Sequence, residues 1–415
     1  MINTNNKKRI VYLTYDGLTD SLGQSQIIPY LKGLSKLNNR ITIISAEKNE
    51  VFLRKREKIK SALDQSNIAW IPIKYTKKPP VLSTLKDIYK FSIELKKIYK
   101  NEGFDIVHCR SYVTSIVGLK FKKRYGVKFI FDMRGFWADE RIDGNIWSFS
   151  NPLFRLVYKY FKNKEKEFLA NADHVVSLTN NAIETINSNF GVKVLDARYS
   201  VIPCCADLDH FKKTEKSEID RATWREKLGI EQDTFVLTYL GSLGTWYLTE
   251  EMVKFFKILV TKFCPNSVFL VVTHDNIEII HKSVIKHQMP LDLIKTTHTD
   301  RGQLPEILTV SDAAVSFIKP SFSKKASSPT KLAELFGLGI PVFSNIGVGD
   351  IEEYYKPIQS LIVKDFKYET LYSVWNSYFS SEKINEKTLV DIAHKYFSLN
   401  LGVERYNNIY KSINN

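Results

Sequence analysis

The sequence predicts an α/β protein made of two doubly wound parallel sheets, each with helices on both faces. Short apolar runs, such as residues 9–14 and 234–240, each lead into a glycine-containing loop and then an amphipathic helix, which is the pattern of a βαβ unit. This alternation is interrupted once, by the polar segment 212–220, and then resumes. A chain of 415 residues is also long for one core, so two domains are expected.

The first half alternates strands and helices. Pro72 indicates that its strand lies near the sheet edge, because proline cannot donate to a strand ladder. In the predicted helices 85–99 and 152–169, Leu85, Leu153 and Tyr160 are expected to face inward, with Lys162 on the solvated side of the later helix. A further helix is predicted over 24–37, and strands over 9–14, 40–45, 68–73, 105–108, 128–131, 173–178 and 199–202.

Several polar residues follow these strands, at the sheet edge where doubly wound folds bind ligands. His108 ends one strand; a lone histidine there is more often structural than functional. Asp132 and Arg134 follow the next strand, and an arginine can pair with phosphate or carboxylate, or close a salt-bridge cluster. The same charged stretch continues with Asp139, Glu140 and Arg141.

The second half repeats the scheme. Gly241 and Ser242 follow a strand at 234–240, and a helix is predicted through residue 260. A helix is predicted at 304–311, and strands at 269–273, 294–297, 313–317, 342–344 and 361–363, with His298 and Lys319 just after two of them. The segment 397–413 carries Tyr406, Ile409, Tyr410 and Ile413 at helical spacing.

The stretch 326–341 predicts a loop, a short helix and a turn into a strand. Ser328 and Pro329 are helix-start signals, and Thr330 and Lys331 fall in the first turn, with Glu334 one turn further. Free N–H groups and the helix dipole suit a phosphate there. The competing interpretation is a capped surface helix with a solvated glutamate.

These motifs resemble those of the retaining glycosyltransferases of family 4 (group 1), which have the GT-B fold. Glu334, Gly339 and Pro341 match the second half of that family's Glu-x7-Glu element, while Ala326 replaces its first glutamate. Residues 15–26 resemble the amino-terminal glycine loop of a bacterial surface-polysaccharide branch, and 105–108 matches its Asp-x-Val/Ile-His strand. Residues 397–413 resemble the family's closing helix, which returns to the first domain.

The resemblance implies two Rossmann-like domains facing a cleft, with domain 1–210 plus 397–415 holding the acceptor and domain 216–396 holding a nucleotide diphosphate-sugar. Asp132, Arg134 and Lys331 are the implied catalytic residues, and His108 and residues 139–141 the acceptor side. The implied donor contacts are Gly23, Gly241, Ser242, His298, Lys319, Ser328, Pro329, Thr330, Lys331 and Glu334. The family's Arg/Lys phosphate pair after Gly241 is missing, and Lys331 or Lys319 would compensate. No metal or cofactor is expected, and Asp207 and Asp209 are not interpreted as metal ligands because they lie in a connecting loop.

Composition bounds the partners. Lys and Arg exceed Asp and Glu by 15, which favours polyanions: a nucleotide diphosphate, nucleic acid or an anionic inner membrane face. The four cysteines show no metal or redox spacing, residues 1–9 lack the apolar run of a signal peptide, and no window is apolar enough to span a membrane, so a cytoplasmic protein, peripheral on the inner membrane, is expected.

The expected function is transfer of a sugar to a glycan or lipid-linked acceptor in surface polysaccharide synthesis, with no nucleic-acid partner. Two alternatives stay open: a basic polyanion-binding protein on a degenerate transferase fold, and a GT-B sugar-nucleotide epimerase or hydrolase. An ATPase is not indicated, because the chain has no Gly-x4-Gly-Lys-Ser/Thr loop.

Overall fold

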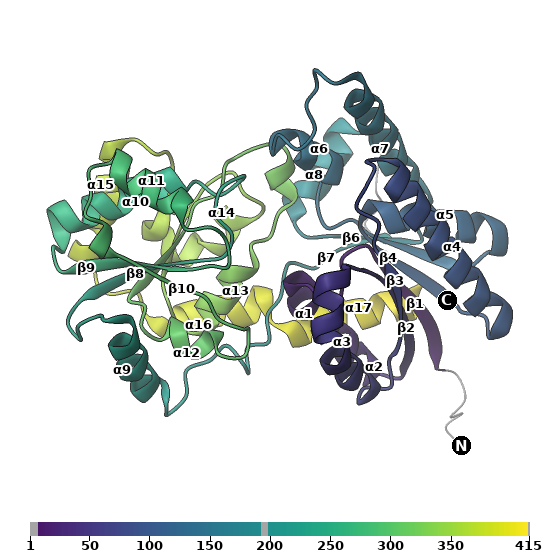
Figure 1. Cartoon of the computed structure of the whole chain (residues 1–415), viewed down its shortest axis with the longest axis horizontal. Helices are drawn as coiled ribbons and strands as arrows, with labels where there is room; N and C mark the ends of the chain where they lie inside the picture. Colours follow the sequence, from purple (N-terminus) through teal and green to yellow (C-terminus); the bar gives the residue numbers. More distant parts are fainter. Residues whose placement is uncertain (1–6, 192–197, 414–415) are drawn as a thin grey trace. The chain divides into compact units, whose positions relative to one another are not determined.

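The computed structural model describes residues 7–191 and 198–413 and contains two compact units (Figure 1). Unit 1 comprises Met1–Cys205 and Leu399–Asn415, and unit 2 comprises Ala206–Ser398. Residues 1–6 and residues 414–415 of the predicted acceptor domain lie outside the described residues. In the two described ranges, no helix is long and apolar enough to cross a membrane.

Unit 1 is built on an all-parallel sheet in the order β3-β2-β1-β4-β5-β6-β7. The order reverses between β1 and β4, which creates a ligand-binding switch point at the carboxyl ends of the strands. Pro72 lies in β3, an edge strand, as predicted. The strands are β1 (Lys8–Thr14), β2 (Asn39–Glu47), β3 (Ala69–Lys74), β4 (Ile106–Arg110), β5 (Lys128–Asp132), β6 (His174–Ser177) and β7 (Tyr199–Val201).

Helices cover both faces of this sheet: α4, α5 and α7 pack on one, and α2, α3 and α17 on the other (Figure 1). The closing helix α17 packs on α2 with Tyr406, Ile409 and Tyr410 buried, as predicted. The bounds are α1 (Ser21–Gln26), α2 (Ile28–Ser35), α3 (Asn49–Asp64), α4 (Leu82–Asn101), α5 (Ser111–Tyr125), α6 (Trp137–Asp143), α7 (Pro152–Asn171), α8 (Asn180–Asn189) and α17 (Leu399–Ser412).

Unit 2 repeats the plan with an all-parallel sheet in the order β10-β9-β8-β11-β12-β13, reversing between β8 and β11. Trp375 anchors its core: the ring is fully buried, stacks 4.3 Å from Phe255 and donates a hydrogen bond of 2.9 Å to the Phe255 carbonyl. The strands are β8 (Phe235–Leu240), β9 (Ser267–Val272), β10 (Ile294–Thr297), β11 (Ala313–Ser316), β12 (Val342–Asn345) and β13 (Ile362–Val363). The helices are α9 (Ser217–Leu228), α10 (Thr249–Ile258), α11 (Glu278–Lys286), α12 (Leu304–Leu308), α13 (Thr330–Gly337), α14 (Ile351–Tyr354), α15 (Tyr368–Ser380) and α16 (Glu386–Phe397).

Two helix predictions and one linker prediction were wrong. The helix expected over 24–37 is two helices, α1 and α2, separated at Ile27, whose φ/ψ values are not helical. Segment 212–220 is not wholly a linker, because α9 begins at Ser217. The helix expected over 304–311 ends at Leu308, because Thr309 begins the short connection to β11.

Side-chain orientation was also mispredicted in two long helices, at the first turns of α4 and α7 and at Tyr160 in the middle of α7. Leu85, Leu153 and Tyr160 are 55%, 48% and 44% exposed. The Lys162 side chain, expected in solvent, instead contacts Asp139. A helix of 20 residues spans about 30 Å, whereas a five-residue strand spans about 16 Å. The first turns of α4 and α7 therefore have little sheet to pack against, so a regular apolar period does not guarantee burial there.

Candidate active site

In unit 2 the loop after β8 meets the first turn of α13. Gly241 has a φ of 119° and lies against Lys331, whose Nζ is 3.1 Å from the place where a Cβ at position 241 would stand. Gly339 ends the α13 turn with a φ of 69°, where a Cβ would collide with Glu386. Glycine is therefore required at both places, and the first leaves room for the Lys331 side chain.

The Lys331 ammonium is held by aromatic rings. Its Nζ lies 4.3 Å from the ring centroids of both Tyr239 and Tyr247, and in the described part of the chain it has no hydrogen-bond partner. The residue is 7% exposed, and burial lowers the pKa of Lys331 to about 7, against the opposing charge of Glu334. Ring faces favour the ammonium form but cannot satisfy its three N–H donors, so the group is poised for an anion.

Glu334 lies one turn further along α13 and is bound to an arginine that the sequence did not single out. Arg301 Nη1 donates to Glu334 Oε1 at 2.5 Å, and the same guanidinium lies 4.9 Å over the Phe211 ring. Burial raises the pKa of Glu334, and Arg301 opposes that rise. Arg301 lies in the loop after β10, a position where ligand-binding residues are expected, but only the folded structure shows that it contacts Glu334.

A cavity of about 310 Å³ lies at the carboxyl ends of β9 and β10, beside His298, one of the implied donor contacts. The rings of His274 and His298 are 5.5 Å apart and offer two adjacent imidazoles. The cavity is lined by Thr273, His274, Asp275, Ile277, Thr296, Thr297 and His298.

The other predicted donor residues lie on the same edge of the sheet but differ in accessibility. Ser242 and Lys319 are exposed, and the Lys319 N–H donates to the Trp246 carbonyl at 2.7 Å, so only its backbone is anchored. Ser328 is buried, and Pro329 and Thr330 are half-buried at the start of α13. Sequence reasoning missed Lys324, which is buried with its Nζ 4.2 Å from the Trp246 ring. Ala326, in place of the family's first glutamate, is fully buried.

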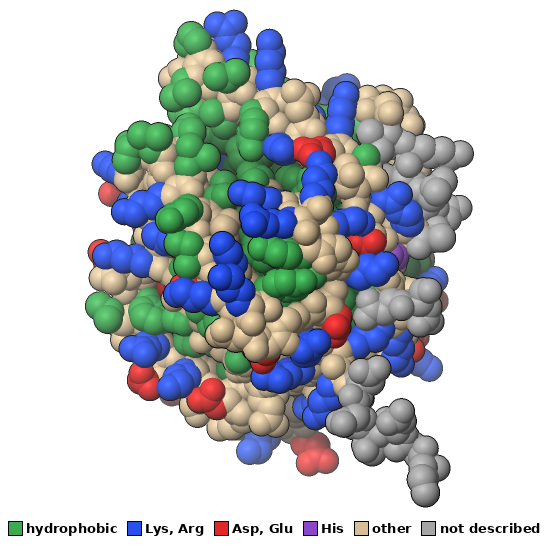
Figure 2. Space-filling model, turned by 90° about the vertical axis from the view of Figure 1, so that its right-hand side faces the viewer, with side chains coloured by type: hydrophobic (Ala, Val, Ile, Leu, Met, Phe, Trp, Pro, Cys, Tyr) green, Lys and Arg blue, Asp and Glu red, His purple; other side chains and the backbone are tan. Residues whose placement is uncertain are grey.

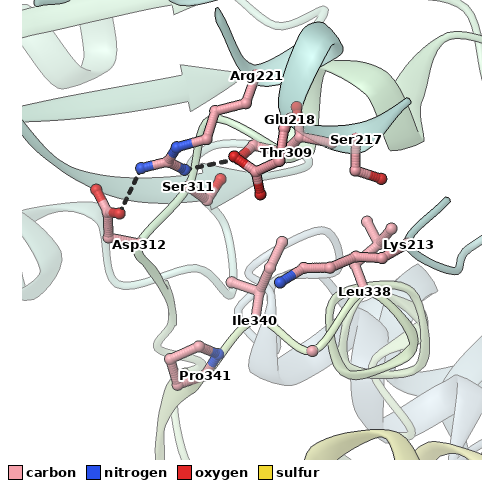
Figure 3. A pocket seen from close by; sticks show the side chains of 11 residues that line it. Lys213, Ser217, Glu218, Arg221, Thr309, Ser311, Asp312, Leu338, Ile340 and Pro341 are labelled. Atoms are coloured by element: carbon pink, nitrogen blue, oxygen red, sulfur yellow. Dashed lines mark hydrogen bonds and ion pairs between the residues drawn. The ribbon is translucent and has the colours of Figure 1, made fainter. Parts of the chain in front are cut away.

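A second cavity of unit 2, about 270 Å³, lies at the opposite ends of β11 and β12 (Figure 3). Gly339 and Pro341 of the family motif line it, but none of the implied catalytic, donor or acceptor residues does. Arg221 crosses it to Asp312 at 2.6 Å and to the Thr309 carbonyl at 2.7 Å. Lys213, also on its wall, is paired with Glu386. Its charges are used internally, so the ligand edge of unit 2 is the one that holds Lys331.

In unit 1 the structure brings His108, Asp132 and Arg134 together, but His108 lies inside β4, two residues before its end at Arg110, and not at the strand end that was predicted. Arg134 has a φ of 55°, and this strained turn carries its side chain back so that Nη1 is 3.8 Å from Asp132 Oδ1. His108 Nε2 is 3.4 Å from Asp132 Oδ2. Burial alone would raise the pKa of Asp132, but Arg134, His108 and Arg110 together keep it below its ordinary value.

The closing helix completes this cluster with two tyrosines that sequence reasoning assigned only to packing. The Tyr406 hydroxyl donates to Asp132 Oδ2 at 3.0 Å, and Tyr410 Oη is 2.7 Å from His108 Nδ1. Burial lowers the pKa of His108, so the ring is neutral at pH 7. A neutral ring that donates from Nε2 to Asp132 accepts at Nδ1 from Tyr410, so the two tyrosines fix both the carboxylate and the tautomer.

The amino-terminal glycine loop already holds an anion of its own. The buried Glu47 carboxylate accepts from the Leu18 N–H at 2.7 Å and from the Thr19 hydroxyl at 2.6 Å. Gly23 lies inside α1, where a Cβ would stand 2.2 Å from the Gly17 carbonyl oxygen. Glycine at position 23 thus has a packing reason, and its donor contact stays a prediction.

Residues 139–141 lie on α6 and do not share one environment. Asp139 is buried and accepts from Tyr158 and Lys162 of α7, both at 2.8 Å, which is a structural role. The Arg141 guanidinium lies 4.7 Å over the Trp137 ring, and Glu140 is half-buried. The structure therefore separates Asp139 from His108, Asp132 and Arg134.

Comparison with known proteins finds similar sequences and similar folds. Residues 28–210 match the model of Glycosyltransferase Family 4. The UDP-Gal:α-D-GlcNAc-diphosphoundecaprenol α-1,3-galactosyltransferase of Escherichia coli is 28% identical over 274 residues, which are 64% of this chain and 64% of that protein.

Solved structures match over almost the whole chain. The Anabaena protein HepE, solved with UDP and glucose, superposes with a TM-score of 0.70 at 12% identity, covering 97% of this chain and 99% of that one. The lipopolysaccharide outer core galactosyltransferase WaaB gives 0.63 at 14%, covering 97% and 99%. The chain thus has the GT-B fold, and its residues 28–210 are similar to Glycosyltransferase Family 4.

Proposed function

We propose that this protein transfers a hexosyl group, with retention, from a nucleoside diphosphate-sugar to a glycan or lipid-linked acceptor in the synthesis of a surface polysaccharide. Its relative from Escherichia coli is named for such a transfer to a lipid diphosphate acceptor. Unit 2 binds the donor and unit 1 the acceptor in this proposal.

One observation carries the proposal: the buried ammonium of Lys331 between two tyrosines, beside Gly241 and the first turn of α13. A diphosphate there would supply the missing acceptors for the N–H groups, and the amino end of α13 would add its dipole. The arrangement stabilises a departing diphosphate, which is where negative charge develops in glycosyl transfer.

The remaining geometry supports the other substrate groups. The cavity beside His274 and His298 has room for a base, and the Glu334 carboxylate, oriented by Arg301, is placed to accept from ribose hydroxyls. In unit 1, His108 and Tyr406 hold the buried Asp132, which pairs with Arg134, and this rigid polar cluster is assigned to orienting an acceptor hydroxyl. Orientation and charge stabilisation then do the catalytic work, and no protein nucleophile is assigned.

The proposal also assigns the enzyme to the inner face of the cytoplasmic membrane, because a lipid-linked acceptor is presented there, and assigns no metal or cofactor to the reaction. Lys331 supplies the positive charge that a divalent ion would otherwise provide. Turnover is therefore expected to be unchanged by EDTA, and a rate restored by added Mg²⁺ or Mn²⁺ would contradict this part.

The decisive experiment is a transfer assay with radiolabelled UDP-hexoses and GDP-hexoses and a synthetic GlcNAc-diphospholipid acceptor. Wild type should elongate the acceptor, and Lys331→Met should reduce turnover by roughly 100-fold or more, the scale of removing one transition-state donor. Lys383→Met, which changes an exposed lysine of unit 2, is the matched control and should retain full activity.

Other products would contradict the proposal in distinguishable ways. Free hexose without elongation would indicate a hydrolase, and an epimerised sugar nucleotide an epimerase. Steeply salt-dependent RNA or DNA binding, without protection by any nucleotide sugar, would indicate a polyanion-binding protein.

A further inference from the structure

The net excess of positive charge is confined to unit 1. Unit 1 carries 37 Lys and Arg against 20 Asp and Glu, whereas unit 2 carries 23 against 25, so the whole surplus of 15 belongs to unit 1. A donor diphosphate bound by unit 2 does not account for this excess. Unit 1 needs a separate anionic partner to explain it.

Within unit 1 the excess concentrates on the outer sides of α4, α5 and α7. On α5 and α7 the exposed charges are Lys120, Lys123, Arg124, Arg155, Lys159 and Lys166, and none of the three helices exposes a carboxylate. Helix α4 adds exposed lysines at 86, 96, 97 and 100. Figure 2 shows this side of the molecule: Lys and Arg side chains intermix with hydrophobic side chains, and carboxylates are sparse.

The same helices expose apolar side chains at their first turns. Leu82 and Leu85 of α4 are 64% and 55% exposed, and Leu153 and Leu156 of α7 are 48% and 66% exposed. These turns follow the carboxyl ends of β3 and, through α6, of β5. They therefore lie toward the sheet edge that carries Asp132 and Arg134.

Between α5 and α7 runs a groove of about 420 Å³ with an apolar floor and a basic rim. Ile116, Leu119 and Phe168 form the floor, and Lys120, Lys123, Arg124 and Lys164 stand around it with Glu167. Glu167 is paired with Lys123 and Lys164, at 2.6 Å each. Lys120 and Arg124 have no ion-pair partner among the salt bridges of the described residues, so the rim keeps an uncompensated positive charge.

We propose that the outer face of α4, α5 and α7 docks on the surface of an anionic phospholipid bilayer. Lys and Arg contact the headgroups, Leu82, Leu85, Leu153 and Leu156 enter the interface, and the α5–α7 groove takes an acyl chain. Exposed leucines beside cations suit a bilayer, which is apolar beneath its charge, better than a nucleic-acid backbone. This inference deepens the proposed function, on which it rests for the lipid-linked acceptor that the docked sheet edge would meet.

The test is flotation of the full-length protein with phosphatidylcholine vesicles that contain or lack phosphatidylglycerol, at low and high salt. Binding should require phosphatidylglycerol and weaken with salt. The triple variant Lys120→Gln, Lys123→Gln, Arg124→Gln should bind about 100-fold more weakly, because each cation near an anionic surface contributes a factor of about five. The pair Leu153→Ser, Leu156→Ser should lose about tenfold.

The matched control is Arg54→Gln, Lys58→Gln, Lys60→Gln on α3, which removes the same charge from exposed positions on the opposite face of the sheet. Equal losses in the two triples, or a leucine pair that binds as well as wild type, would overturn the inference, as would tighter binding to RNA than to the vesicles.

Transfer to a short, water-soluble acceptor separates this inference from the proposed function. Such transfer with no vesicle binding would reject the docking face alone. Vesicle binding as described, without transfer of any sugar, would reject the proposed function alone.

Discussion

Replacing Lys331 by methionine should reveal how much folding free energy is spent on keeping this amine in place. Burial moves its pKa from 10.5 to about 7, so between these values the unfolded chain binds a proton that the folded chain releases. The stability contribution of this residue is therefore least favourable below pH 7 and improves as the pH rises toward 10.5. At pH 8 the cost is about 3 kcal/mol, from 1.36 kcal/mol per pKa unit.

The variant without ligand should then be more stable than wild type. Lys331→Met removes the desolvated charge but also two ring contacts, so a net gain of about 1–3 kcal/mol is expected at pH 8, falling to ~1 kcal/mol or less at pH 9.5. Urea denaturation at both pH values measures it, with Lys383→Met as the control. A stabilised protein that has lost its activity would identify a functional group kept at the expense of stability.

The same amine should make nucleotide binding depend on pH. With a pKa of about 7, half of the amines are protonated at pH 7 but only ~3% at pH 8.5, so the affinity for UDP or GDP should fall roughly 15-fold, or ~1.7 kcal/mol, over that interval. The terminal phosphate titrates near pH 6, so the ligand itself changes little there. Calorimetric titration measures this slope. An affinity independent of pH from 7 to 8.5, or a slope that survives in Lys331→Met, would refute the reasoning.

Three further changes test other parts of the molecule. Tyr406→Phe removes one hydrogen bond to Asp132. It should lower kcat several-fold with little change in the donor KM, and it should reduce the free energy of unfolding by ~1 kcal/mol, as measured by kinetics and urea unfolding. An unchanged kcat would show that the tyrosine is a packing residue only. Arg301→Met leaves the Glu334 carboxylate buried without its arginine, which should destabilise the protein by about 2–4 kcal/mol at pH 8. Because burial raises the pKa of Glu334, the loss should shrink as the pH falls and the carboxyl group is protonated; a pH-independent loss would show that the ion pair is not its cause. Trp375→Ala should cost about 3–5 kcal/mol, seen by calorimetry as a lower melting temperature, and a loss below ~1 kcal/mol would show that the core of unit 2 collapses around the space.

The strand–helix alternation was sufficient to predict both sheets, because buried parallel strands leave continuous apolar runs. Pro72 marked an edge strand, and the spacing in 397–413 identified the packed side of α17. The periodicity of apolar residues did not predict burial where burial depends on the packing of whole elements. The exposed Leu153 lies on a helix that is longer than the strands beneath it. The break at Ile27 did have a local signal, because Pro29 stands in the first turn of α2.

The candidate site could be predicted only in part, for a related reason. Lys331 and Glu334 belong to one short motif, so local signals found them. Their partners come from other elements, Tyr239 from strand β8 and Arg301 from the loop after β10, and Tyr406 reaches Asp132 across 274 residues of sequence. Nothing in the local sequence around Asp132 indicates such a partner, so only the folded topology reveals it.

Glu47 makes the glycine loop of unit 1 differ from that of unit 2, because it already accepts a hydrogen bond from the backbone of the loop. The Glu47 carboxylate belongs to the same chain as the Leu18 N–H that it accepts from, so it occupies that amide in advance of any free phosphate. That turn is thereby locked in a filled state for the life of the folded chain. Unit 1 thus supplies its own permanent anion to this turn. In the proposed function only unit 2 exchanges an anion, the donor diphosphate, in each turnover.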